Sequence, residues 1–135
     1  MKILVSACLL GQPCRWHGKN IRPSSFIEKY KIENPDHVLI AVCPETLGGL
    51  PTPRPPVKRR KGRVFETCAD KKNRKNVTGP EVTDYFIKGA QETLKIAQRE
   101  GITKAFLCYW SPSCDKTGIT GKLLIENGIE VINTW

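Results

Sequence analysis

The sequence predicts an α/β protein, and three observations carry that prediction. Four short apolar runs alternate with segments of helical periodicity, which is the order that builds a parallel sheet covered by helices. Each run is nearly continuously apolar, as expected for a strand covered on both faces. The chain has 135 residues, enough to bury about two-thirds of its unfolded surface in one core. We therefore predict a single domain over residues 1–135, a small three-layer, Rossmann-like fold with a short, mainly parallel sheet of about four strands.

The predicted strands are short and rich in β-branched residues. They lie within residues 2–7, 37–42, 104–109 and 128–134. The first strand ends at Cys8, the second ends at Cys43, and Cys114 follows the third. Because the carboxyl ends of parallel strands meet at one edge of the sheet, where open α/β sheets bind ligands, we expect these three thiols to lie near one another.

Three segments have helical periodicity. They are residues 24–32, 81–100 and 116–127. The second is the strongest, with an apolar stripe formed by Val82, Phe86, Ala90, Leu94 and Ala97. Thr78 and Glu81 have the spacing of a capping box, which predicts a helix start near Pro80. Gly101 supplies the stop.

One stretch, residues 51–76, is predicted to be irregular and basic. Four prolines lie between residues 50 and 57, which excludes a central strand there, and residues 63–67 are predicted as a short edge strand. From Lys58 to Lys75 the chain carries nine basic and two acidic residues, so +7 of the total net charge of +9 lies in this segment. This local charge favours RNA or a nucleotide as a partner, with a solvated loop as the alternative.

The amino-terminal residues do not have the length of a secretion signal. Only Ile3 and Leu4 precede the small-residue box that ends at Cys8, whereas a signal core needs about 7–15 apolar residues. No apolar run approaches the roughly 20 residues of a membrane span. We therefore expect a cytoplasmic protein without a membrane partner, whose six cysteines stay reduced.

The cysteines could bind zinc, hold an iron–sulfur cluster, act as nucleophiles or pack in the core. There is no C-x-x-C pair, which disfavours a zinc finger, a thioredoxin-type redox pair and a ferredoxin-type run. Three separated thiols at strand ends can still hold a cube-like cluster that leaves one iron free. Cys14 could join them, Cys108 is expected to pack inside its strand, and Cys68 is expected to be an incidental loop thiol.

Polar candidates lie close to these cysteines in the sequence. Glu45 follows Cys43 by two residues, and a carboxylate there could activate water or merely be a cap or a solvated charge. Ser111 and Ser113 could cap the next helix or present hydroxyl groups to a ligand. Arg54 lies next to Pro53 and Pro55, and its guanidinium could fork onto a carbonyl or a phosphate. Arg54 and Ser113 are therefore candidates for substrate binding.

Four motifs follow one another in a recognisable order. They are Ser6-Ala7-Cys8-Leu9-Leu10-Gly11 with Cys14-Arg15, then Cys43-Pro44-Glu45 with Gly48-Gly49-Leu50-Pro51-Thr52-Pro53-Arg54, then Val77-Thr78 through Phe86-Ile87-Lys88-Gly89-Ala90, and finally Ser111-Pro112-Ser113-Cys114. Together they resemble domain-of-unknown-function family 523, which includes thiouracil desulfidase. The resemblance covers nearly the whole chain.

The resemblance implies a [4Fe–4S] cluster held by Cys8, Cys43 and Cys114, with Cys14 as the alternative to Cys8. It implies an enzyme whose open iron takes the sulfur of a thiolated nucleobase while water replaces that sulfur on carbon, without net redox change.

Glu45 would be the acid–base residue and Ser111 a second polar assistant, again by resemblance. The basic stretch from Val57 to Lys61 and the residue Asp115 depart from the family pattern, so the substrate could be thiouracil or a related small thio-compound. If the basic stretch binds nucleic acid, the thiolated base could also lie within RNA. The alternative function is a basic nucleic-acid-binding module with structural or zinc-binding cysteines.

Overall fold

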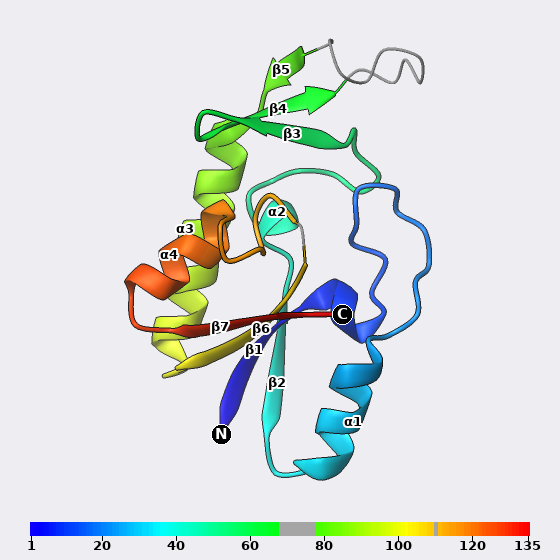
Figure 1. The fold of residues 1–135 in the computed structure, drawn as a ribbon, viewed down its shortest axis with the longest axis vertical. Coiled ribbons are helices and arrows are strands. Elements are labelled where there is room, and N and C mark those ends of the chain that lie inside the picture. Colours follow the sequence, from blue (N-terminus) through cyan, green and yellow to red (C-terminus); the bar gives the residue numbers. More distant parts are fainter. Residues whose placement is uncertain (68–77, 110) are drawn as a thin grey trace.

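A four-stranded parallel sheet forms the centre of the protein. Its strands are β1 (Lys2–Ser6), β2 (Val38–Val42), β6 (Lys104–Cys108) and β7 (Glu130–Thr134). They lie in the order β2-β1-β6-β7 and every neighbouring pair is parallel, so the α/β prediction and its four strands are confirmed (Figure 1). The computed structural model describes residues 1–67, 78–109 and 111–135 of the chain.

Helices cover both faces of this sheet and complete the three layers. They are α1 (Ser25–Glu33), α3 (Thr83–Arg99) and α4 (Ile119–Glu126). The chain crosses the sheet in one direction from β1 to β2, and in the other from β2 to β6 and from β6 to β7. Since such crossovers are right-handed, α1 lies on one face while α3 and α4 lie on the other (Figure 1). None of the helices in the described ranges is long and apolar enough to cross a membrane.

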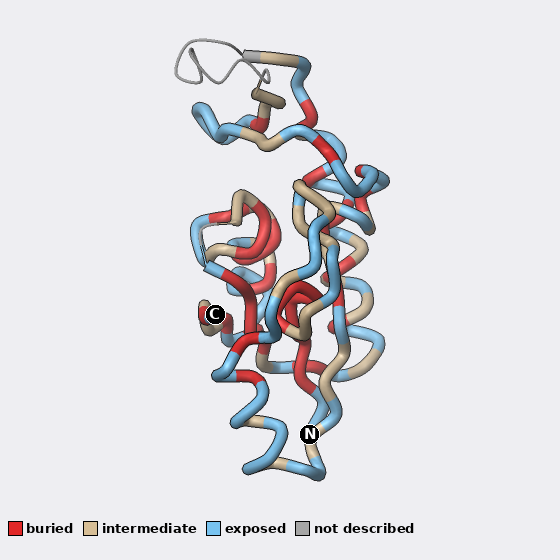
Figure 2. Tube along the Cα trace, turned by 90° about the vertical axis from the view of Figure 1, so that its right-hand side faces the viewer, coloured by how far each residue is buried: buried red, intermediate tan, exposed pale blue. Residues whose placement is uncertain are grey.

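The core lies between these layers. The consecutive side chains of Ile3, Leu4 and Val5 are all fully buried, although neighbours in a strand point to opposite faces. On the α1 side, the rings of Phe106 and Phe26 meet edge to face at 5.2 Å. Figure 2 shows buried residues concentrated in the sheet and its helices. The predicted burial of both faces is confirmed for β1 and β6, but the edge strand β2 is only partly buried, with Val38 52% exposed.

A second, antiparallel sheet stands beyond one end of the first and corrects two predictions. It consists of β3 (Val57–Arg60), β4 (Arg63–Thr67) and β5 (Thr78–Glu81), in that order. Residues 57–67 are therefore not irregular, and residues 63–67 form a central strand rather than an edge strand. Lys61 and Gly62 have φ of 50° and 76°, the turn that closes a two-residue hairpin, so pairing here needs no apolar run. Residues 68–76 of the predicted irregular segment, with Cys68, lie outside the described residues.

The start of α3 is also a correction. Thr78 and Glu81 do not form a capping box, because both belong to β5. Pro80 is compatible with that strand since β5 is at the edge of its sheet. The helix begins at Thr83, whose Oγ1 accepts a hydrogen bond from the Val64 N–H at 2.8 Å. Contact with β4 therefore sets the start of α3.

The carboxyl ends of β1 and β6 mark the point where the connections diverge to opposite faces of the sheet. Open α/β sheets bind ligands in the crevice outside such a switch point. Three short segments surround it: η1 (Ala7–Leu10) after β1, α2 (Pro44–Leu47) after β2, and residues 111–118 before α4. The fold thus brings together the motifs that carry the candidate site residues.

Candidate active site

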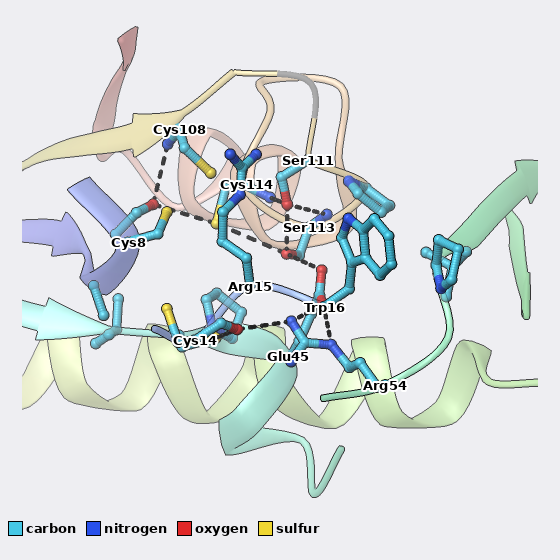
Figure 3. A pocket seen from close by; sticks show the side chains of 18 of the residues that line it. Cys8, Cys14, Arg15, Trp16, Glu45, Arg54, Cys108, Ser111, Ser113 and Cys114 are labelled. Atoms are coloured by element: carbon cyan, nitrogen blue, oxygen red, sulfur yellow. Dashed lines mark hydrogen bonds and ion pairs between the residues drawn. The ribbon is translucent and has the colours of Figure 1, made fainter. Parts of the chain in front are cut away.

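Five cysteines line one cavity at the carboxyl ends of the strands. The cavity has a volume of about 230 Å³ and includes the thiols of Cys8, Cys14, Cys43, Cys108 and Cys114 (Figure 3). The structure therefore brings together the three thiols that were expected to meet at the strand ends. Cys14, which the sequence allowed there, and Cys108, which it did not, line the cavity as well.

Each thiol owes its place to a strand end or to the loop that follows. Cys8 is in η1 and Cys43 precedes the first turn of α2. Cys108 is the last residue of β6, where the sequence placed it inside the strand as a packing residue. It does pack in the core, at 4% exposure, but it also lines the cavity because β6 ends one residue earlier than predicted.

The thiols interact strongly with one another. Hydrogen bonding with Cys43 and then with Cys8 lowers the pKa of the Cys14 thiol to about 3. Hydrogen bonding to Cys14, together with burial, raises the pKa of Cys43. Hydrogen bonding to Cys108 and burial likewise raise the pKa of Cys114. The cavity therefore offers soft sulfur ligands that a metal can take once it displaces their protons.

Hydroxyl groups hold two of these sulfurs in place. Ser6 Oγ donates to Cys114 Sγ at 3.3 Å and accepts the Cys108 N–H at 3.1 Å. Thr46 Oγ1 donates to Cys43 Sγ at 3.2 Å. The sequence analysis missed both hydroxyls, although each lies within three residues of a cavity cysteine in the chain. Such outer partners orient ligands and tune the metal that they hold.

Glu45 and two serines form a polar edge of the same cavity. Ser113 Oγ donates to Glu45 Oε1 at 3.4 Å, and Ser111 Oγ lies 3.0 Å from Ser113 Oγ (Figure 3). Ser111 Oγ also accepts the N–H of Cys114 at 3.1 Å. Ser111 therefore caps its turn, one of the two roles that the sequence left open, and Ser113 contacts the carboxylate. Both serines also line the cavity.

Arg54 is a fixed part of the cavity wall. Its Nε donates to Glu45 Oε2 at 2.7 Å and its Nη2 forms an ion pair with the same oxygen. The remaining N–H groups are directed at the Cys14 carbonyl (3.0 Å), the Pro51 carbonyl (3.3 Å) and Thr52 Oγ1 (3.0 Å). All five guanidinium donors thus have protein acceptors. The fork expected on a substrate carbonyl or phosphate is made with the protein instead, because residues 51–54 fold back over Glu45.

Arg15 and Trp16 also line the cavity, and the sequence analysis did not assign them a role. The guanidinium carbon of Arg15 lies 5.0 Å from the centre of the Trp135 ring. Trp16 is 45% exposed, which is unusual for so large an apolar side chain. The sequence feature that could have identified both as site residues is their position directly after Cys14.

The described residues do not favour a mononuclear metal centre. Within residues 1–67, 78–109 and 111–135, no three His, Cys, Asp or Glu side chains are grouped to hold a single metal ion. A zinc-binding cysteine site, one of the alternatives from the sequence, therefore has no support in this part of the chain. Five thiols around one cavity are the kind of donor that iron–sulfur clusters take from proteins.

The fold and the cavity together define an α/β protein with a cysteine-rich site at the switch point of its sheet. The sequence model of the 2-thiouracil desulfurase family matches residues 3–134, and the chain belongs to that family. The resemblance drawn from the four motifs is thereby confirmed.

Two similar proteins support the membership. Over 146 aligned positions the chain is 30% identical to the uncharacterized protein YbbK of Bacillus subtilis (strain 168), with 97% of this chain and 94% of YbbK covered. It is 35% identical to the solved [4Fe-4S]-dependent thiouracil desulfidase TudS (DUF523Vcz), with a TM-score of 0.79. That match covers 98% of this chain and 89% of the TudS chain.

Proposed function

We propose that this protein is an enzyme that removes sulfur from a thiolated nucleobase, such as thiouracil, by hydrolysis with the help of a [4Fe–4S] cluster. The observation that carries the proposal is one cavity lined by five thiols, with a carboxylate and hydroxyl groups at its edge. The family, and a solved relative named as a [4Fe-4S]-dependent thiouracil desulfidase, support it.

Cys8, Cys43 and Cys114 would hold the cluster. They follow three different strands, β1, β2 and β6, so they approach the cavity from separate segments. Cys14 remains the alternative to Cys8, because it interacts with both Cys8 and Cys43. When bound through three cysteines, the cluster supplies an iron without a protein ligand, which acts as a Lewis acid toward sulfur.

Glu45 would take the proton of the attacking water. Both Arg54 contacts fall on Oε2, whereas the contact that Oε1 makes with the described residues is the longer one of 3.4 Å from Ser113. Oε1 is therefore the better placed oxygen for a general base. The water oxygen bonds to the carbon and the carbon–sulfur bond breaks. One water proton goes to Glu45 and the other leaves with the sulfur as hydrosulfide. No electrons are gained or lost overall.

The test is anaerobic reconstitution with iron and sulfide, followed by incubation with thiouracil. We expect visible absorption from bound iron–sulfur, and uracil and sulfide in equal amounts. Cys43→Ala should abolish iron uptake, while Cys108→Ala should leave it largely intact. Glu45→Gln should bind the cluster but lower the rate by about 100-fold or more, the range of general base catalysis. Equal loss of iron in both cysteine variants, or cluster uptake without uracil, would rule the proposal out.

A second candidate function is binding of RNA or a nucleotide through the segment from Lys58 to Lys75. A second cavity, of about 680 Å³, lies between the β3–β4 hairpin and helices α3 and α4. Its charged lining residues are Arg59, Arg60, Lys61, Lys122 and Glu126. An excess of positive charge around a cavity suits phosphate groups. The two functions are compatible if the thio-base is part of a nucleotide or RNA.

We also propose a cytoplasmic location. A cavity that needs free thiols for metal binding depends on a reducing compartment.

A further inference from the structure

We infer that Arg15 and Trp16 recognise the ring of the substrate, with Arg15 donating hydrogen bonds to a ring carbonyl and Trp16 stacking on the flat face. This inference rests on the proposed function and deepens it. It defines the substrate class as a planar heterocycle that carries an oxygen acceptor in addition to its sulfur, as opposed to an open-chain thioamide.

The two arginines of the cavity differ in how their donors are used. Every N–H of the Arg54 guanidinium is directed at a protein acceptor, so none is left for a ligand. Arg15 lines the same cavity, but its guanidinium makes no hydrogen bond or ion pair with the described part of the chain. The guanidinium lies against the face of Trp135 and close enough to Cys108 for its charge to act on that thiol, and neither contact uses its N–H groups in a hydrogen bond. The guanidinium that can fork onto a ligand carbonyl is therefore that of Arg15.

Trp16 supplies an aromatic surface in the same place. Figure 3 shows its indole in the cavity with Glu45 and Ser113, the residues of the polar edge. The backbone around it is held, since the Trp16 carbonyl accepts the Arg54 N–H at 2.7 Å. Trp16 is 45% exposed, so a large part of its surface is free of contact with protein atoms. Stacking on such a ring stabilises a bound nucleobase irrespective of its hydrogen-bond pattern.

Recognition and chemistry would thus come from different side chains. The cluster held by the thiols would bind the sulfur, Glu45 would take the proton of the water, and Arg15 and Trp16 in the loop after η1 would contact the ring. Because Arg15 and Trp16 detect different features, two ligands can separate their contributions. Uracil has both the flat ring and the carbonyl oxygens. Pyridine thione keeps the flat ring and the sulfur but has no oxygen.

The experiment measures equilibrium binding of each ligand to the cluster-loaded protein under anaerobic conditions. Arg15→Gln should weaken uracil binding by about 10-fold and leave pyridine thione binding unchanged, because a forked hydrogen bond is lost. Trp16→Leu should weaken both ligands by about 10-fold, whereas Trp16→Phe, which keeps a flat ring, should stay near wild type. Tyr85→Leu is the matched control, since Tyr85 is 47% exposed on α3 outside the cavity.

The outcomes separate this inference from the proposed function. If Arg15→Gln weakens both ligands equally, or neither, Arg15 does not read an oxygen. If Trp16→Leu binds like wild type, there is no stacking. If the wild type desulfurates thiouracil but the Arg15 and Trp16 variants bind both ligands like the wild type, the inference is overturned and the proposed function stands. Selective losses of binding without any desulfuration would uphold ring recognition and overturn the function. Iron content, measured in every variant, shows whether the cavity itself is intact.

Discussion

Ser6 joins two of the cavity cysteines through a single hydroxyl group. Its Oγ donates to Cys114 Sγ and accepts the N–H of Cys108, and the side chain is only 1% exposed. Buried polar groups that lose such a partner are costly, because water cannot replace it. At this scale the stability of the strand end and the orientation of a sulfur ligand depend on the same atom.

We predict that Ser6→Ala destabilises the cluster-free protein by about 1–3 kcal/mol, the cost of an unsatisfied buried N–H. The loss of the hydrogen bond to Cys114 should also lower the iron retained after a chelator challenge. Denaturant unfolding and iron analysis measure the two effects. Ser25→Ala, at an exposed position of α1, should change neither. Wild-type iron retention in Ser6→Ala would show that the hydroxyl does not support the ligand.

Helix α2 is placed by its close contact with α3. A methyl group at Gly48 would overlap the Tyr85 carbonyl oxygen, and one at Gly89 would overlap the Pro44 carbonyl oxygen. The two backbones therefore approach more closely than any side chain would allow. Since Cys43 immediately precedes α2 and Glu45 belongs to it, two glycines that do not themselves line the cavity set the position of a proposed ligand and of the proposed base.

Gly89→Ala should therefore affect both stability and the site. We expect a loss of about 1–3 kcal/mol, as for other overpacked positions, and a fall in melting temperature of about 3–5 °C for each kcal/mol. Thiouracil turnover should fall as well, since α2 must move. Lys88→Ala, an exposed neighbour on the same helix, is the control and should stay within about 0.5 kcal/mol. A fully active, equally stable Gly89→Ala would contradict the tight contact.

Strands and helices with a buried apolar face could be predicted from the sequence, whereas strands without one could not. The four central strands and α3 could be predicted because their buried faces leave continuous or periodic apolar patterns. The strands β3 and β5 could not, because a hairpin rich in Lys and Arg and a strand with Pro80 carry no such pattern. Their pairing depends on a turn and on backbone hydrogen bonds, which composition does not record.

The site followed the same rule. Strand ends brought Cys8, Cys43 and Cys114 to one cavity, since parallel topology alone puts them there. Arg15 and Trp16 depend on the path of a loop, which no periodicity describes. The sequence pointed to Arg54 as the arginine that contacts substrate, whereas we infer that role for Arg15. This could not be predicted, because only the folded structure shows which guanidinium donors already have protein acceptors.

The charge of the whole molecule is distributed unevenly between its two sheets. Of the net +9, +7 lies between Lys58 and Lys75, and the described part of that segment belongs to the β3–β4 hairpin, whose Lys and Arg side chains are exposed. Arg59 links the hairpin to the segment of the polar edge by donating to the Thr117 carbonyl at 2.7 Å. The basic surface and the thiol cavity are therefore mechanically connected, although they have separate linings.

If RNA binds here, reversing the hairpin charge should weaken it selectively. We predict that the double variant Arg60→Glu and Lys61→Glu lowers the affinity for single-stranded RNA by about 10-fold or more at low salt. It should also reduce the slope of log K against log salt by about 0.7 for each phosphate contact that is lost. Turnover of free thiouracil should not change, because neither residue lines the thiol cavity.

The matched control is Lys29→Glu with Lys31→Glu, which makes the same change in net charge on α1, at the opposite end of the molecule (Figure 1). Filter binding over a salt series compares the two double variants. Equal losses of RNA affinity in the two double variants would mean that RNA responds to the net charge of the whole molecule. A local site on the hairpin would not respond to charges on α1, because salt screens charges over about 10 Å at moderate salt. Binding that is absent even in the wild type at low salt would leave the basic hairpin as a solvated surface and the free base as the substrate.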